Sequence, residues 1–233
     1  MTNGLKATNL ILAYRMSAGI HTVLNLEELI VPAGSVVGIT GPSGSGKTSL
    51  LHVLGGLERP QYGSVCWGGD DLCRLTETER DRWRRERVGM IFQDFHLLPG
   101  MTALQNVLVP ATFDRFVLSG QVKDRARALL THVGVPGGLQ RVETLSRGEM
   151  QRVAVARALL FAPSIVLADE PTASLDGASS ERVTMLLLDS CREARTTVVV
   201  VSHDSAVLRR LDAVHTLVGG RLTTTAQDTV SRC

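Results

Sequence analysis

Cysteine, net charge and long hydrophobic runs are all scarce in this sequence. The four cysteines, Cys66, Cys73, Cys191 and Cys233, form no C-x-x-C pair, which disfavours a zinc site or a disulfide framework and suits a reducing compartment. The 25 Lys and Arg nearly balance the 23 Asp and Glu, so the net charge of +2 gives no footprint for nucleic acid. No apolar run approaches the ~18 residues that a membrane-spanning helix needs, and no signal peptide is evident. If the protein serves a membrane, another chain must cross it.

The sequence does contain short apolar runs that alternate with helical patterns. Almost wholly apolar runs, typical of parallel strands covered on both faces, occupy 35–40, 164–169 and 196–202. Helical patterns occupy 47–57, 123–133, 149–162 and 180–194. The alternation predicts an α/β fold, and Gly219-Gly220 predicts a hairpin near the end of the chain. The Arg-rich run 79–87 is interleaved with acidic residues and predicts a solvated helical face.

The stretch GITGPSGSGKTSLL (38–51) carries the strongest chemical signal. It contains G-x-x-x-x-G-K-[ST], from Gly41 to Thr48, between a strand pattern and a helical pattern, which is the context of a phosphate-binding loop. The glycines allow a tight turn whose N–H groups point at phosphates, and the helix N-terminus favours anions. Lys47 is expected to reach the β- and γ-phosphates, and Thr48 to ligate Mg²⁺. This context disfavours the alternative of a simple glycine-rich turn.

Two strand ends supply the other groups that nucleotide hydrolysis needs. Asp169 ends an apolar run, where its carboxylate can hold Mg²⁺, and Glu170 can activate the attacking water. An isolated Asp-Glu pair would more often belong to a turn, but the upstream phosphate loop favours the catalytic interpretation. His203 follows a neighbouring strand and can bond the γ-phosphate, because ligands of open α/β sheets sit at the carboxyl ends of strands. Gln93 is uninformative by itself.

In this order the motifs resemble those of the ATP-binding subunit of an ABC transporter, over about residues 5–222. GPSGSGKTSLL matches the Walker A motif, IFQDFHLLPGMTALQNV looks like the Q-loop, and TLSRGEMQRVAVARALL looks like the signature and its helix. IVLADEPTASLD matches Walker B and the D-loop, and VVVVSHD matches the H-loop. The run TETERDRWRRERVGMIFQDFHLLPGMTALQNVLVPA and the single-domain length are similar to the macrolide-exporter and lipoprotein-releasing group.

The resemblance implies that the chain hydrolyses ATP with Mg²⁺. It implies catalytic roles for Gln93, Glu170 and His203 and metal contacts from Thr48, Gln93 and Asp169. Tyr14 stands where the family has the aromatic residue that stacks on adenine. The nucleotide-binding residues that it implies are Tyr14, Gly41, Pro42, Ser43, Gly44, Ser45, Gly46, Lys47, Thr48, Ser49, Ser146, Gly148 and Asp176.

It also implies an architecture. A P-loop NTPase core with a mostly parallel sheet would comprise about 30–95 and 161–222, with a small antiparallel β subdomain mainly within 1–75. An α-helical signature subdomain would cover about 96–160, and a polar tail 223–233. Two copies would bind two ATP molecules head to tail, so that each signature contacts the nucleotide held by the other copy.

The expected partners are ATP, a second copy of the chain and an integral membrane permease that chooses the substrate, with no nucleic acid. The subunit would lie in the cytoplasm, peripherally on the cytoplasmic face of the inner (plasma) membrane, and would power export or release. The alternative is a mechanical regulator, because the similar cell-division ABC pair controls cell-wall hydrolases and exports nothing. A soluble ABC ATPase acting on DNA or ribosomes is disfavoured, because the chain has neither a long coiled coil nor a second ATPase domain.

One residue departs from the family pattern. Arg147 stands in SRGE (146–149) where glycine is usual, and Glu149 replaces Gln. The same four residues read as a capping box, with Ser146 capping a helix and still able to donate its hydroxyl proton to the other copy's γ-phosphate. Arg147 would either hold the phosphate away or turn its charge toward ATP or an acidic neighbour. We favour the second, because the backbone donors survive, and expect Arg147→Gly to change turnover by less than about tenfold, or ~1.4 kcal/mol.

Overall fold

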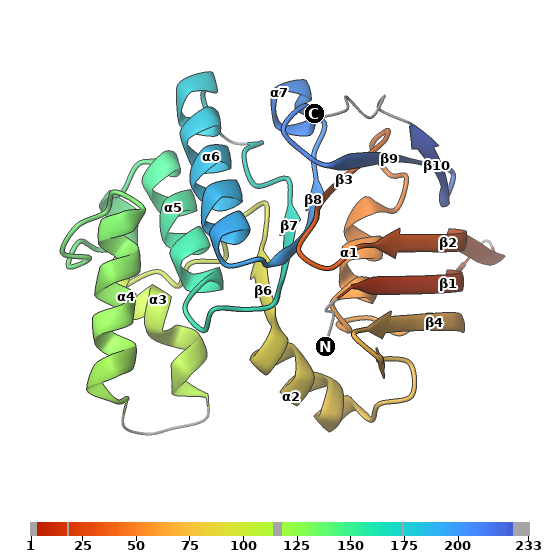
Figure 1. The fold of residues 1–233 in the computed structure, drawn as a ribbon, viewed down its shortest axis with the longest axis horizontal. Coiled ribbons are helices and arrows are strands. Elements are labelled where there is room, and N and C mark those ends of the chain that lie inside the picture. The colour runs from red at the N-terminus through yellow and green to blue at the C-terminus, as the bar shows by residue number, and fades with distance from the viewer. Residues whose placement is uncertain (1–3, 18, 114–117, 174, 226–233) are drawn as a thin grey trace, which may run out of the picture.

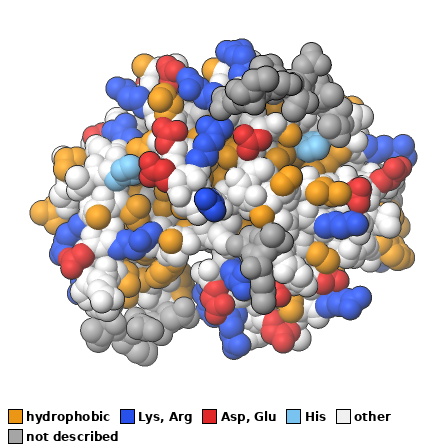
Figure 2. Space-filling view, in the orientation of Figure 1, with side chains coloured by type: hydrophobic (Ala, Val, Ile, Leu, Met, Phe, Trp, Pro, Cys, Tyr) orange, Lys and Arg blue, Asp and Glu red, His pale blue; other side chains and the backbone are white. Residues whose placement is uncertain are grey.

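The computed structural model describes residues 4–17, 19–113, 118–173 and 175–225, and it contains two β-sheets (Figure 1). A six-stranded sheet runs through the middle, with most of the helices at one end and a four-stranded antiparallel sheet at the other. Within these ranges, no helix combines the length and apolar character that crossing a bilayer requires. Figure 2 shows acidic and basic side chains interspersed over one face, which is not the single-sign surface that nucleic acid favours.

The central sheet has the strand order β10-β9-β3-β8-β7-β6. Its strands are β3 (Val36–Thr40), β6 (Val88–Ile91), β7 (Ile165–Asp169), β8 (Thr197–Val201), β9 (Ala213–Val218) and β10 (Arg221–Thr225). Neighbours pair in parallel except β10, which turns back on β9 at the predicted Gly219-Gly220 hairpin. The three apolar runs are confirmed as strands β3, β7 and β8, which are almost entirely buried.

The register of the central sheet sends alternate residues into two different cores. Val37 pairs with Val199, and both contribute to the core that the central sheet shares with the four-stranded sheet. Val36 pairs with Val198, and both contribute to the core on the other side, with α6 (Gly177–Glu193). Because both faces are covered, these strands need apolar residues at every position.

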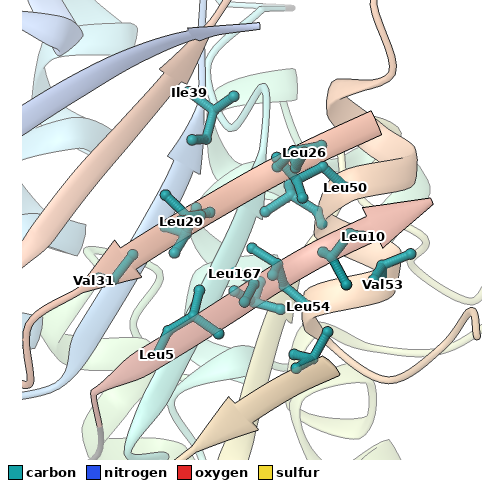
Figure 3. Packing of buried hydrophobic residues seen from close by; sticks show 14 of the residues in the cluster. Leu5, Leu10, Leu26, Leu29, Val31, Ile39, Leu50, Val53, Leu54 and Leu167 are labelled. Atoms are coloured by element: carbon teal, nitrogen blue, oxygen red, sulfur yellow. The ribbon is translucent and has the colours of Figure 1, made fainter. Parts of the chain in front are cut away.

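The four-stranded sheet packs over the first helix of the central sheet. Its strands are β1 (Leu5–Met16), β2 (Gly19–Val31), β4 (Tyr62–Trp67) and β5 (Asp70–Asp71), in the order β2-β1-β4-β5. Leu10 of β1 and Leu26 of β2 lie near Leu50 and Leu54 of α1 (Lys47–Leu54), and Leu167 of β7 belongs to the same core (Figure 3). The helix that follows the phosphate loop is therefore fixed between the two sheets.

A separate core holds the helices at the other end of the molecule. Val107 of α3 (Ala103–Thr112), Leu130 of α4 (Gly120–His132) and Val153 of α5 (Arg147–Ala158) meet in it. A short 3-10 turn, Val142–Thr144, leads into α5. Val155 on α5 belongs instead to the core of the central sheet, so α5 joins the helical end to the sheet. The remaining helices are α2 (Glu77–Arg87) and α7 (Ser205–Leu208).

Some predicted boundaries are wrong, for identifiable reasons. The helix predicted at 180–194 begins three residues earlier, because the Asp176 side chain accepts a hydrogen bond from the Ser179 N–H and caps it. The polar tail predicted at 223–233 is part of β10 as far as Thr225, and its remainder lies outside the described residues. The arginine-rich helix α2 is mostly exposed as predicted, apart from Trp83, which packs in the first core.

Candidate active site

The loop between β3 and α1 adopts a conformation that its sequence makes possible. Gly41 has a φ of 147°, and a Cβ there would collide with the carbonyl oxygen of Leu217. Gly46 has a φ of 98° and is the N-cap of α1, where no side chain caps the helix. The first N–H groups of α1 therefore lack a side-chain partner, and its first turn carries no acidic residue. Such an uncapped N-terminus is suited to an anion.

Lys47 and Thr48 open α1 and point into a cleft of about 530 Å³. The Lys47 ammonium donates to the carbonyl oxygens of Gly41 and Pro42, at 2.9 Å each, so its charge lies over the loop. The Thr48 hydroxyl donates to the Asp169 carboxylate at 2.7 Å. A hydroxyl and a carboxylate are hard oxygen ligands of the kind that Mg²⁺ prefers. The residues present therefore fit a phosphate and a magnesium ion.

Glu170 follows β7 and enters the same cleft in an unusual backbone conformation. Its φ is 44°, and its N–H donates to the Val201 carbonyl at 2.9 Å. The imidazole Nδ1 of His203, beyond the end of β8, donates to the Glu170 carboxylate at 2.9 Å. The Glu170 side chain is 13% exposed and that of His203 70% exposed. A left-handed non-glycine residue costs of order 1–3 kcal/mol and is typical of functional sites.

The other predicted residues of the phosphate loop do not all line the cleft. Ser43, Gly44 and Ser49 line it together with Gln93, which follows β6. The remaining two residues, Pro42 and Ser45, are not part of the cleft lining. The Ser45 side chain is buried and its hydroxyl has no hydrogen-bond partner among the described residues, and Pro42 contributes the carbonyl that accepts from Lys47.

Tyr14 lies beside the cleft on β1 and is 40% exposed. Its hydroxyl donates to the Glu58 carboxylate at 2.5 Å. Partial burial and then this hydrogen bond raise the pKa of the phenol, while a hydrogen bond with Ser49 opposes the shift. The Ser49 contact places the Tyr14 hydroxyl next to α1, at the edge of the cleft.

Three predicted binding residues lie apart from this cleft, where two helices begin. Ser146 caps α5 in the predicted capping box: its hydroxyl accepts from the Glu149 N–H at 3.3 Å and donates to the Glu149 carboxylate at 2.7 Å. The hydroxyl proton expected to be available for a phosphate is thus engaged. A Cβ at Gly148 would lie 3.4 Å from the Ser179 hydroxyl, so α5 and α6 begin side by side. Asp176 caps α6 at this same edge.

Arg147 has a partner that the sequence did not indicate. Its guanidinium lies 5.5 Å from the centre of the Phe95 ring, whereas ATP or an acidic neighbour was the expected partner. Farther along α5, Arg157 donates to the backbone carbonyls of Phe95 and His96, at 2.6 and 2.5 Å. No spacing rule links residues so far apart in sequence, so only the folded chain reveals this cluster.

Sequence reasoning also missed an apolar groove of about 790 Å³ between α2, β6, α3 and α5. Phe113 and Phe161 line it and are 72% and 47% exposed. Its other lining residues include Leu57, Met90, Phe92, Val109, Pro110 and the arginines Arg82, Arg84, Arg85 and Arg157. Because the lining comes from several elements, no single stretch of sequence carries a signal for it.

Comparison with known proteins gives consistent matches. The family model for the ABC transporter matches residues 24–173. The lipoprotein-releasing system ATP-binding protein LolD of Hyphomonas neptunium is 40% identical over 210 residues, which cover 90% of this chain and 92% of that protein. LolD 2 of Caulobacter vibrioides is 43% identical over 214 residues, again covering 90% and 92%. The dimeric ATP-binding cassette MJ0796, bound to ADP and Pi in a post-hydrolysis state, has a TM-score of 0.86 and 36% identity and covers 94% of this chain and 96% of that one.

Proposed function

Because this chain belongs to the ABC transporter family, as an ATP-binding and ATP-hydrolysing subunit, we propose that its ATPase activity drives the release of lipoproteins from a membrane. The predicted family resemblance and the α/β P-loop fold are confirmed. The observation that carries the ATPase part of the proposal is the cleft in which Lys47, the Thr48–Asp169 pair and the Glu170–His203 pair converge. Similarity to LolD proteins over nine-tenths of the chain favours lipoprotein release over mechanical regulation.

The triphosphate of ATP would lie along the phosphate loop. The free N–H groups at the start of α1 would bond its oxygens, and Lys47 would exchange the carbonyls of Gly41 and Pro42 for phosphate. Tyr14, at the edge of the cleft, would stack on the adenine ring. Thr48, Asp169 and Gln93 would hold Mg²⁺, which neutralises charge that develops on the phosphates.

Glu170 would act as the general base. Its carboxylate points into the cleft and is little exposed, so it can accept a proton from a water that attacks the γ-phosphate. His203 now donates to this carboxylate and would turn its N–H to the γ-phosphate when ATP is bound. Gln93, which follows the neighbouring strand β6 and lines the same cleft, would orient the water.

A second copy of the chain would complete each site. Ser146, Gly148 and Asp176 stand at the starts of α5 and α6, apart from the cleft of their own chain, and are available to a nucleotide held by another copy. The dimeric form of the similar cassette MJ0796 supports this arrangement. The Ser146 hydroxyl would exchange its bond to Glu149 for one to the γ-phosphate.

The membrane permease would dock in the apolar groove, on the cytoplasmic face of the inner membrane. Exposed Phe113 and Phe161 supply the apolar surface that a partner segment can bury. Phe92 and His96 line the groove, while Gln93 between them lines the nucleotide cleft. The segment 92–96 therefore faces both the nucleotide cleft and the proposed permease site. Through it, a change at the nucleotide could alter the contact with the permease.

The deciding experiment is lipoprotein release from proteoliposomes that contain the permease and this chain. ATP should release lipoprotein with the wild-type chain, whereas Glu170→Gln should bind ATP, form an ATP-bound dimer and release almost none. Glu193→Gln, an exposed carboxylate at the end of α6, is the matched control and should behave as wild type. Wild-type hydrolysis by Glu170→Gln would refute the assignment of the base. ATP-dependent activation of a cell-wall hydrolase without release would favour the mechanical alternative.

A further inference from the structure

The segment that follows Gln93 is held in a strained conformation. Phe95 and His96 are consecutive non-glycine residues with φ of 57° and 47°. This left-handed region is unfavourable for any residue with a Cβ, so surrounding contacts must maintain the conformation. The Phe95 ring is buried, at 8% exposed, and His96 stacks against Phe92 with ring centres 4.7 Å apart.

The restraining contacts come from one helix, α5, at two points. Arg157 fixes the backbone, because its guanidinium donates to the carbonyls of both left-handed residues. Arg157 is half-buried, and this burial lowers the pKa of its guanidinium. Arg147 fixes the side chain, because its guanidinium lies over the Phe95 ring. Arg147, which makes the contact with the ring, is the first residue of α5 and lies between Ser146 and Gly148.

We propose that Arg147 is a positioning residue that ties the first turn of α5 to the segment after Gln93 through the Phe95 ring. The inference rests on the proposed function, in which that turn grips the nucleotide of a second copy. Through Arg147, the signature surface of one chain moves together with the Gln93 segment of its own cleft. Glycine at this position could not make the contact, and a planar guanidinium stacks on a ring better than an ammonium does.

Loss of the Arg147–Phe95 contact is expected to change the orientation of α5 and not the chemistry of ATP hydrolysis. Without the contact, the first turn of α5 keeps its capping box and its approach to Ser179, so the helix still forms. Its angle to the Gln93 segment is less restricted, and a smaller fraction of chains presents the signature correctly to a second copy. A cation–π contact of ordinary strength predicts about a threefold to tenfold weaker ATP-bound dimer.

The test uses the full chain with Glu170→Gln, which traps the ATP-bound dimer. The dimer dissociation constant at saturating ATP is measured by analytical ultracentrifugation for Arg147→Gly, Phe95→Leu and the double variant. Each single variant should weaken the dimer about threefold to tenfold, and the double variant no more than either alone, because both remove one contact. ATP affinity of the isolated chain should not change. Arg147→Lys should fall between wild type and Arg147→Gly.

Glu77→Gly is the matched control, because Glu77 is likewise the first residue of a helix with a capping box and is exposed. It should leave dimerisation unchanged. A second readout needs no dimer: amide hydrogen exchange in residues 92–96 of the nucleotide-free chain should accelerate in both single variants. Unchanged dimerisation in Arg147→Gly, or additive effects in the double variant, would overturn the proposal. If the Glu170→Gln chain itself forms no ATP-bound dimer, the proposed function fails instead.

Discussion

Lys47 illustrates how a single residue depends on a backbone that only glycine permits. Its ammonium reaches the carbonyls of Gly41 and Pro42 because Gly41 turns the chain close under Leu217. The same geometry places the ammonium beside the N-terminus of α1, which no side chain caps. The positive charge of Lys47 and the partial positive charge of the helix N-terminus therefore lie together. Both features favour an anion, so much of the phosphate affinity is expected to depend on this one side chain.

Lys47→Ala should therefore lose most of the chain's ATP affinity, by about tenfold to a hundredfold in Kd, since a hydrogen bond to a charged group contributes about 1.5–3 kcal/mol. The measurement is a direct titration of the isolated chain with ATP. Lys123→Ala, an exposed lysine on α4, is the control and should bind as wild type. Unchanged affinity in Lys47→Ala would contradict the assignment of the phosphate loop.

Individual residues also mark the limit of sequence-based inference. The convergence of the phosphate loop, Asp169, Glu170 and His203 in one cleft could be predicted, because each lies at the end of a strand pattern and strand ends meet at one edge of a parallel sheet. The contact of Arg147 with Phe95 could not be predicted, because it depends on two residues in the left-handed conformation, and neither of them is a glycine. The pairing of the Ser146 hydroxyl with Glu149 follows from the capping box, but the competition that it creates with a phosphate was not foreseen.

At the scale of elements, three helices begin with the same arrangement. The N-cap residues Thr76, Thr102 and Ser146 each exchange hydrogen bonds with a Glu or Gln three positions later. This local chemistry is readable from sequence, and the capping box predicted at 146–149 is present at the start of α5, although the helix ends at Ala158, four residues before the predicted pattern. The starts of α4 and α6 were predicted too late, because Ser119 and Asp176 cap them before the apolar pattern begins.

Ser146→Ala should destabilise the chain by about 1 kcal/mol, the usual effect of losing an N-cap. The measurement is urea unfolding of the nucleotide-free chain. Thr76→Ala removes the equivalent cap of α2, outside both proposed nucleotide surfaces, and should cost a similar amount. We expect both variants to lose the same stability, but only Ser146→Ala to weaken the ATP-bound dimer. That result would separate the capping role of Ser146 from its contact with the nucleotide. No stability loss in Ser146→Ala would contradict the capping role.

The capping box of Ser146 and Glu149 also predicts how the stability of the chain depends on pH. Hydrogen bonds from the side chain and backbone of Ser146 hold the pKa of Glu149 below its usual range. A carboxylate with a lowered folded-state pKa stabilises the fold above its unfolded-state pKa, and the contribution disappears as pH falls through the folded-state value. The difference in stability between wild type and Ser146→Ala should therefore shrink in acid.

At the scale of the whole molecule, the two sheets and the helical end present three surfaces. The cleft lies at the carboxyl edge of the central sheet, the signature surface at the starts of α5 and α6, and the groove between α2, α3 and α5. The α/β order of the elements made the first surface predictable. The groove could not be predicted, because its apolar residues are scattered over the chain and converge only after folding.

Phe161→Glu should separate ATP chemistry from coupling to the permease. The side chain is half exposed in the groove, so the isolated chain should fold and bind ATP as wild type. A charge on the apolar surface should weaken binding to the permease by at least about tenfold, measured by co-purification from membranes. Val218→Glu changes a similarly exposed apolar residue, on β9 and outside the groove lining, and should retain the permease. Full retention by Phe161→Glu would exclude the groove as the docking site.

The separation of cleft and groove also bears on how such a protein can diverge. Among the described residues, none lines both: the cleft draws mainly on the loops at strand ends, and the groove on α2, β6, α3, α5 and the segments that flank them. On the docking proposed above, substitutions that adapt the groove to a different permease could accumulate while the ATP chemistry stays intact. One ATPase lineage could in this way come to serve new permeases through changes on one surface, while selection preserves the other.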